Sequence, residues 1–279
     1  MKRAFQTPLL LAAALGATIS LAVPGTALAG ASAPAPAENS QLRLLSADGA
    51  ADADGARLAG VELQLAAGWK TYWRQPGDAG VPPHFDFSGS ENLAEAEVLY
   101  PAPKRFREGP VESAGYDRSL VFPVRVMPAD PGKPVGLSVR LDYGVCREVC
   151  VPASAEARLA MPAAAPRDIA AAVPISGALR EVPAPPAEGG LGVVAVRHLG
   201  EAIEIDLRLA DPKAAFDLFA EGPADWYLPL PEATGQTGDV ATFRLRLASR
   251  PAGAKIEGQS FLFTATNGRR ATEQRWRLD

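Results

Sequence analysis

The feature that most constrains the fold of this chain is a series of short segments in which apolar and polar residues alternate. In residues 58–65, for example, Val61, Leu63 and Leu65 alternate with polar side chains. A period of two puts successive side chains on opposite faces of a strand, so one face can be buried. The pattern recurs, between Pro and Gly clusters, in residues 41–46, 121–127, 137–141, 193–197, 203–209, 242–247, 261–263 and 276–278. Many short, half-buried strands predict an all-β fold built from sandwiches.

A stretch rich in Pro and Ala divides these segments into two groups. We therefore expect two immunoglobulin-like β-sandwich domains, residues 41–162 and residues 191–279, joined by a linker at residues 163–190. Within the linker, residues 167–180 could form a short helix of one or two turns, although Pro174 interrupts the pattern.

The N-terminus is typical of a secretory signal peptide. Lys2 and Arg3 precede an apolar stretch at residues 9–21, and Ala-Leu-Ala at residues 27–29 offers a cleavage site. The apolar stretch is shorter than the roughly 20 residues that span a bilayer. We expect cleavage after residue 29, a disordered lead-in at residues 30–40, and export to a Gram-negative periplasm without stable membrane insertion.

Charge excludes one class of partner. Without Lys2 and Arg3 the mature chain keeps 26 basic and 32 acidic side chains, a net charge of −6. Nucleic-acid binding needs a basic face for the phosphates, so we expect no nucleic-acid partner.

Cys146 and Cys150 are the only cysteines, and in an exported protein they can form a disulfide. Four residues of straight strand span about 13 Å, whereas a disulfide needs Cα atoms within about 7 Å. A bond between the two therefore requires a turn at residues 147–149. Such a small loop would stabilise the fold by only about 2 kcal/mol. A short-range pair can also open and close without disturbing the fold, which favours thiol–disulfide exchange over a structural staple.

Two alternatives remain open. The chain could be a non-catalytic binding or scaffold module whose disulfide braces a loop. The two thiolates could also bind Cu(I), and so serve copper tolerance. A closed zinc site would need four ligands, and His84 and His198 are far from each other and from the cysteines in sequence. We therefore predict no zinc site, and the thiol–disulfide exchange interpretation involves no metal site and no cofactor.

Several motifs occur in a fixed order along the first predicted domain. They are residues 68–80 (GWKTYWRQPGDAG), 100–103 (YPAP), 115–116 (GY), 121–124 (VFPV), 143–146 (YGVC) and 150–152 (CVP). In this combination the chain resembles the N-terminal periplasmic domain of the DsbD family, and within it the ScsB-like branch. The resemblance extends over residues 40–165; for residues 190–279 it rests only on a comparable extra β region.

The resemblance implies an immunoglobulin-like sandwich that carries a redox-active cysteine pair. It implies that Cys150 forms the mixed disulfide with partners and that Cys146 resolves it. The implied partners are periplasmic thioredoxin-like proteins or DsbD-type membrane redox proteins. The resemblance also implies a loop that covers the pair, and residues 73–80, with Trp73 and Asp78, are the candidate; a tight turn with a core tryptophan is the other interpretation.

Full-length DsbD-type reductases add a membrane electron channel and a thioredoxin-like domain, and this sequence shows neither. The resemblance therefore implies an electron relay, a possible component of a protein-disulfide reductase that needs an electron donor in trans.

Four neighbours of the cysteines could support the exchange chemistry. Negative charge on Asp142 and Glu148 would raise the pKa of a thiol, whereas Arg147 would lower it. Tyr143 could pack beside the pair. The other interpretation is that the three charged residues are solvated turn residues and that Tyr143 is a strand aromatic.

Overall fold

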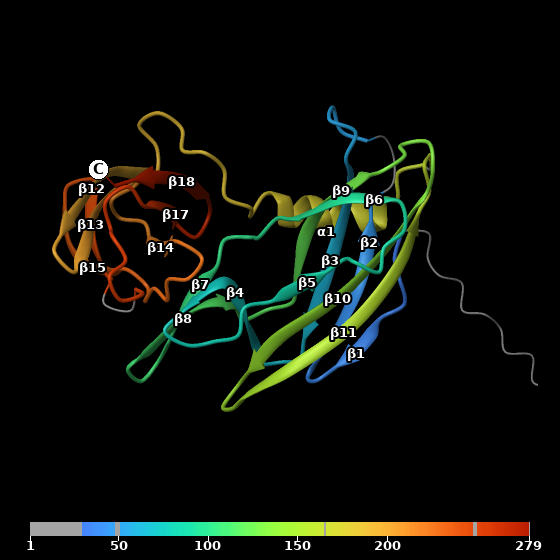
Figure 1. The fold of residues 1–279 in the computed structure, drawn as a ribbon, viewed down its shortest axis with the longest axis horizontal. Helices are drawn as coiled ribbons and strands as arrows, with labels where there is room; N and C mark the ends of the chain where they lie inside the picture. The colour runs from blue at the N-terminus through green and yellow to red at the C-terminus, as the bar shows by residue number, and fades with distance from the viewer. Residues whose placement is uncertain (1–29, 48–50, 165, 248–249, 279) are drawn as a thin grey trace, which may run out of the picture.

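The computed structural model describes residues 30–47, 51–164, 166–247 and 250–278, whose strands form two β-sandwiches side by side (Figure 1). The first sandwich holds strands β1 to β11 and the second holds β12 to β18, with helix α1 between them in sequence. The prediction of an all-β fold of immunoglobulin-like sandwiches is confirmed.

The first sandwich consists of a five-stranded and a six-stranded sheet. The five-stranded sheet has the order β1 (Ala35–Ala37), β2 (Ser40–Ser46), β3 (Arg57–Leu65), β9 (Leu120–Pro128), β6 (Leu93–Val98). The second sheet has the order β11 (Cys150–Met161), β10 (Val135–Cys146), β4 (Lys70–Gly77), β8 (Val111–Tyr116), β7 (Lys104–Glu108), with β5 (His84–Asp86) paired to β10.

Alternation along β2 and β9 builds two apolar layers. Leu44 and Phe122 lie in the core between the two sheets. Their neighbours in sequence, Leu45 and Val121, lie on the opposite face, under helix α1. The five-stranded sheet is therefore buried on both faces where the helix covers it.

Helix α1 (Ile169–Leu179) begins at Asp168, whose side chain accepts a hydrogen bond from the backbone N–H of Ala171. The helix has 11 residues and continues through Pro174, so the expected one or two turns were too short. Ile175 is fully buried against the sheet at Gly60, where a Cβ would lie 2.9 Å from the Ile175 side chain. This close packing offsets the hydrogen bond that Pro174 cannot donate.

The second sandwich consists of a four-stranded and a three-stranded sheet. The first has the order β12 (Gly192–Leu199), β13 (Ala202–Arg208), β16 (Val240–Arg246), β15 (Glu232–Thr237), and the second has the order β14 (Asp217–Glu221), β17 (Ser260–Thr266), β18 (Ala271–Arg277). Its own core includes Phe243, Phe261 and Phe263, all buried. Phe219 and Leu230, in contrast, pack into the core of the first sandwich.

The structure corrects the expectation of disorder at residues 30–40. Strand β1 pairs antiparallel with β2, and Ala31 bridges to Leu45. The low hydrophobicity of this segment hid its strand, which is stabilised by backbone pairing at the sheet edge. The expected signal peptide at residues 1–29 lies outside the described residues. None of the described helices has the length and apolar character needed to cross a bilayer.

Candidate functional site

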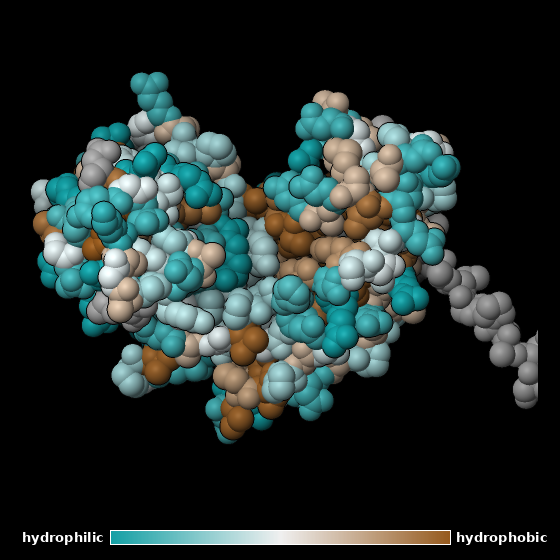
Figure 2. Space-filling view, in the orientation of Figure 1, coloured by the Kyte–Doolittle hydropathy of each residue, from teal (hydrophilic) through white to brown (hydrophobic). Residues whose placement is uncertain are grey.

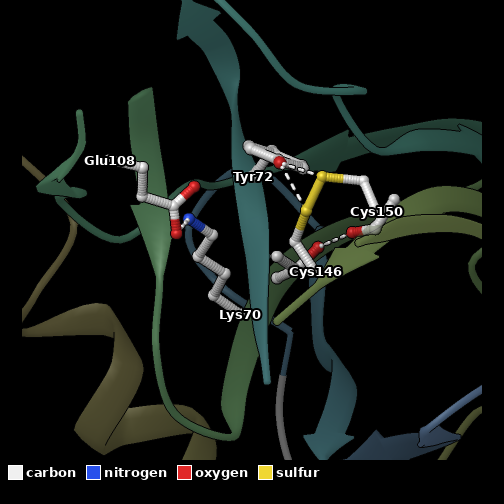
Figure 3. Close-up of a disulfide and its surroundings, with 7 residues drawn as sticks. Lys70, Tyr72, Glu108, Cys146 and Cys150 are labelled. Carbon is white, nitrogen blue, oxygen red and sulfur yellow. Dashed lines mark hydrogen bonds and ion pairs between the residues drawn. A yellow bond between two sulfur atoms is a disulfide. The ribbon is translucent and has the colours of Figure 1, made fainter. Parts of the chain in front are cut away.

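The cysteine pair closes the hairpin formed by the two longest strands of the first sandwich, β10 and β11. Cys146, the last residue of β10, lies directly opposite Cys150, the first residue of β11, with their Cα atoms 4.1 Å apart. Arg147, Glu148 and Val149 form the turn between them. The two sulfurs are joined in a disulfide (Figure 3). The turn that the sequence requires for this bond is therefore present.

The two cysteines differ in their exposure to solvent. Cys146 is only 2% exposed, whereas Cys150 is exposed. The neighbouring Val149 is 70% exposed. Cys150 therefore lies beside the exposed turn at the end of this hairpin.

Tyr72 on β4 covers the buried side of the disulfide (Figure 3). Its hydroxyl lies 3.0 Å from the sulfur of Cys146 and 3.0 Å from that of Cys150. Because disulfide sulfurs carry no hydrogen, the phenol is the donor in both contacts. Burial, and next the negative charge of Glu108, raises the pKa of Tyr72. The hydroxyl therefore keeps its proton at the pH where thiols titrate.

The loop after β4 lies against the ring of Tyr72. Gly80 has a φ of +131°, and a Cβ at this position would lie 2.4 Å from the Tyr72 ring. Gly144 on β10 allows a similar approach, since a Cβ there would lie 3.1 Å from Val81 and 3.4 Å from the ring. The two glycines and Val81, which is 51% exposed, hold the ring in place beside the sulfurs.

An ion pair flanks the site on the side of β4. Lys70 pairs with Cys146 in the β10–β4 ladder and is only 8% exposed. Its Nζ lies 2.5 Å from a carboxylate oxygen of Glu108 (Figure 3). The same nitrogen lies 5.2 Å from the centre of the Phe106 ring. Close to Cys146, the less exposed cysteine, the site thus has a hydrogen-bond donor in Tyr72 and a lysine whose charge is neutralised by Glu108.

Comparison with known proteins agrees with this geometry. A family model described as the N-terminal part of the thiol:disulfide interchange protein DsbD matches residues 41–162. Residues 41–162 are a DsbD N-terminal-like domain. The crystal structure of the N-terminal periplasmic domain of ScsB from Proteus mirabilis has a similar fold, with a TM-score of 0.69 and 20% sequence identity over 86% of this chain and 94% of that domain. No curated protein matches the chain in sequence.

Within the DsbD N-terminal-like domain, two aromatic residues of the sequence analysis lie away from the sulfurs. The hydroxyl of Tyr143 lies 2.6 Å from the hydroxyl of Ser40. Trp73 is 1% exposed and packs edge-on against Phe219, with ring centres 5.7 Å apart. Residues 73–77 belong to β4, so Trp73 is a core residue and not part of a cover over the pair.

The four charged candidates also differ in position. Asp142 pairs with Arg140, and a hydrogen bond with Ser154 is the main cause that lowers its pKa. The guanidinium of Arg147 lies over the ring of Trp69, 5.7 Å from its centre. Glu148 and Asp78 are exposed, Glu148 in the hairpin turn and Asp78 in the loop after β4. Of these residues only Arg147 and Glu148 lie in the turn that the disulfide closes.

Sequence analysis did not single out Tyr72. The residue lies inside the motif at residues 68–80, from which only Trp73 and Asp78 were predicted as site residues. Tyr72 and Trp73 are adjacent in a strand, so their rings face opposite sides of it. Only the register of β4 with β10 decides which of the two rings contacts the sulfurs.

Among the described residues, no three His, Cys, Asp or Glu side chains come together in a way that could hold a metal ion.

Proposed function

We propose that this protein is a periplasmic thiol–disulfide exchange protein that relays electrons between partner proteins through Cys146 and Cys150. The observation that carries the proposal is the position of the disulfide. It closes a hairpin in which Cys150 is exposed, whereas Cys146 is buried beneath a hydrogen-bond donor. The DsbD N-terminal-like domain supports the same chemistry.

Electron uptake begins when a partner's thiolate attacks the exposed Sγ of Cys150. The disulfide breaks, and Cys146 leaves as a thiolate that accepts the hydrogen bond from Tyr72. A second thiolate of the partner then attacks the partner's own sulfur in the mixed disulfide and releases Cys150. The partner is oxidised by two electrons, and the two cysteines of this protein are reduced and take up two protons as thiols.

Electron delivery is the reverse process with another partner. The thiolate of Cys150 attacks a disulfide of the acceptor, and Cys146 then attacks Cys150 and restores the original bond. The acceptor leaves with two thiols. No cofactor is needed, and partners with a cysteine pair at an accessible surface, such as thioredoxin-like proteins or DsbD-type membrane proteins, fit both steps.

Trapping tests the proposal directly. The variant Cys146→Ala keeps the exposed thiol but cannot resolve a mixed disulfide. In periplasmic extract it should accumulate adducts through Cys150 that dithiothreitol releases, and mass spectrometry would identify the partners. The matched variant Cys150→Ala leaves only the buried thiol and should trap far less.

A redox titration distinguishes the relay from a structural staple. A relay requires a disulfide that reduced thioredoxin-like proteins can open. A pair with a reduction potential below about −300 mV, together with an empty Cys146→Ala trap, would show that the bond is a structural brace.

A further inference from the structure

A cleft of about 650 Å³ lies between the two sandwiches, away from the disulfide. The start of β7, the end of helix α1, the segment before β14 and the turn between β17 and β18 line it. Figure 2 shows a notch between the two halves of the molecule on the face that it draws. The volume of the cleft is within the range of small-molecule binding sites.

The lining of this cleft is strongly basic. Six cationic side chains contribute to it, against the two carboxylates of Glu181 and Asp217; the six are Lys104, Arg105, Arg118, Arg180, Arg269 and Arg270. The whole chain, in contrast, has a net charge of −4. The positive charge is therefore concentrated locally on an acidic protein.

Three of the six cations are neutralised by their neighbours. Arg105 lies 2.7 Å from Asp217. Lys104 lies 2.9 Å from Asp117, which is outside the cleft. Arg118 pairs with Glu181.

Arg180, Arg269 and Arg270 have no ion pair among the described residues. All three are exposed. Uncompensated like charges around one cleft repel each other, and an anion between them would relieve the repulsion.

The turn that carries two of these arginines is held in shape by its own hydrogen bonds. The side-chain oxygen of Asn267 accepts from the backbone N–H of Arg269 at 3.1 Å and from that of Arg270 at 2.8 Å. The hydroxyl of Thr266 accepts from the N–H of Gly268, whose φ is +77°. A preorganised turn loses little conformational freedom when a ligand binds.

We propose that this cleft binds a ligand that carries two or more phosphate or carboxylate groups. Guanidinium groups bind such oxyanions through paired, charge-assisted hydrogen bonds. The half-buried ring of Phe216 adds an apolar wall beside them. Because neither cysteine lines the cleft, the ligand would bind independently of the redox chemistry.

Calorimetry with two probes tests the proposal on the whole protein. The probes are inorganic pyrophosphate and a peptide of six glutamates, which represent a free phosphate ligand and a carboxylate-rich protein segment. At least one should bind saturably, and more weakly as salt increases. The variant Arg269→Ala/Arg270→Ala should weaken that binding about tenfold or more.

The control variant is Arg158→Ala/Arg244→Ala, which removes two exposed arginines from strands outside the cleft. The control variant should bind the probe as tightly as the unsubstituted protein does. Both variants should have the melting temperature of the unsubstituted protein. Binding of pyrophosphate alone assigns the cleft to small oxyanions, and binding of the peptide alone assigns it to an acidic segment. No saturable binding of either probe below about 1 mM, or an equal loss in the control, would overturn the proposal.

Discussion

Tyr72 does not distinguish the two sulfurs by distance, because its hydroxyl lies 3.0 Å from each. The difference between them comes from burial, since Cys146 is 2% exposed and Cys150 is exposed. In the proposed relay a partner attacks Cys150, the more exposed of the two cysteines, so the negative charge of the leaving group develops on Cys146. The phenol is therefore in place to stabilise that charge, and the direction of attack follows from the fold.

Replacing Tyr72 with Phe should slow opening of the disulfide. The departing Cys146 thiolate would lose a hydrogen-bond donor, and a hydrogen bond to a charged group contributes about 1.5 kcal/mol or more. We expect the rate of reduction by a thioredoxin-like protein to fall about tenfold. The pKa of the Cys146 thiol in the reduced protein should rise, because the thiolate loses stabilisation. Stopped-flow kinetics and a thiolate absorbance titration would measure both effects.

Tyr143→Phe is the matched control for Tyr72→Phe. It also removes a buried phenol hydroxyl, but that hydroxyl interacts with Ser40 and not with sulfur. It should leave the exchange rate unchanged and affect only stability. If the two variants and the original protein had equal rates of disulfide reduction, Tyr72 would have no role in the exchange mechanism.

At the scale of elements, alternation predicted the strands that are half buried. Strand β13, for example, shows a period of two because its buried residues alternate with partly exposed ones. Strand β15 (Glu232–Thr237) is exposed along its whole length, so its sequence has no apolar face to detect. The cysteine hairpin was predictable from its four-residue spacing, whereas the contact of Tyr72 with the sulfurs depends on how β4 pairs with β10. Such registers arise from long-range packing, which local sequence does not encode.

Gly115→Ala should disrupt the pairing that holds β4. Gly115 on β8 lies opposite Tyr72 in the ladder, and a Cβ there would lie 2.1 Å from the backbone oxygen of Thr71. Backbone at this distance must move, so β4 and β8 would separate. We expect the free energy of unfolding to fall by about 3 kcal/mol, as urea denaturation would measure. The exchange rate should also change, because Tyr72 moves with its strand.

Gly235→Ala provides the comparison for the Gly115 variant. Gly235 also lies in a strand, β15, but a Cβ at this position would meet nothing within 4 Å. Its stability should change little. A Gly115→Ala protein as stable as this control would mean that the two strands can separate without cost.

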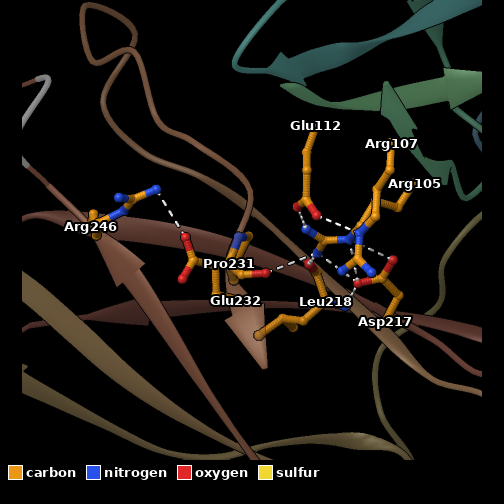
Figure 4. A network of polar contacts seen from close by, with 8 residues as sticks. All are labelled: Arg105, Arg107, Glu112, Asp217, Leu218, Pro231, Glu232 and Arg246. Atoms are coloured by element: carbon orange, nitrogen blue, oxygen red, sulfur yellow. Dashed lines mark hydrogen bonds and ion pairs between the residues drawn. The ribbon is translucent and has the colours of Figure 1, made fainter. Parts of the chain in front are cut away.

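At the scale of the whole molecule, one strand links the disulfide to the second sandwich. β4 carries Tyr72 at the disulfide and Arg74 at the interface. Arg74 binds Glu221 at 2.7 Å and also pairs with Glu273, both from the second sandwich. On β7, which β8 separates from β4 in the same sheet, Arg105 binds Asp217 and the backbone oxygens of Leu218 and Pro231 (Figure 4).

This interface combines charge with apolar packing. Trp73 meets Phe219, and the side chain of Leu230 lies close to Gly77. A partly buried ion pair of this kind is costly to break, because the carboxylates left behind lose their cation in a poorly hydrated place. The second sandwich therefore helps to hold β4 in position through its contacts with Trp73, Arg74 and Gly77.

Arg74→Ala should weaken the contact between the two sandwiches and loosen β4. Glu221 and Glu273 would face each other without the cation that now lies between them, so we expect the free energy of unfolding to fall by about 2 kcal/mol. Urea denaturation followed by tryptophan fluorescence would measure it, since Trp73 lies at the interface. Arg125→Ala is the control, because Arg125 binds three carboxylates, one more than Arg74, but is more exposed and lies within the first sandwich. If Arg74→Ala behaved like that control, the two sandwiches would be independent units, and the second would not position the strand that bears Tyr72.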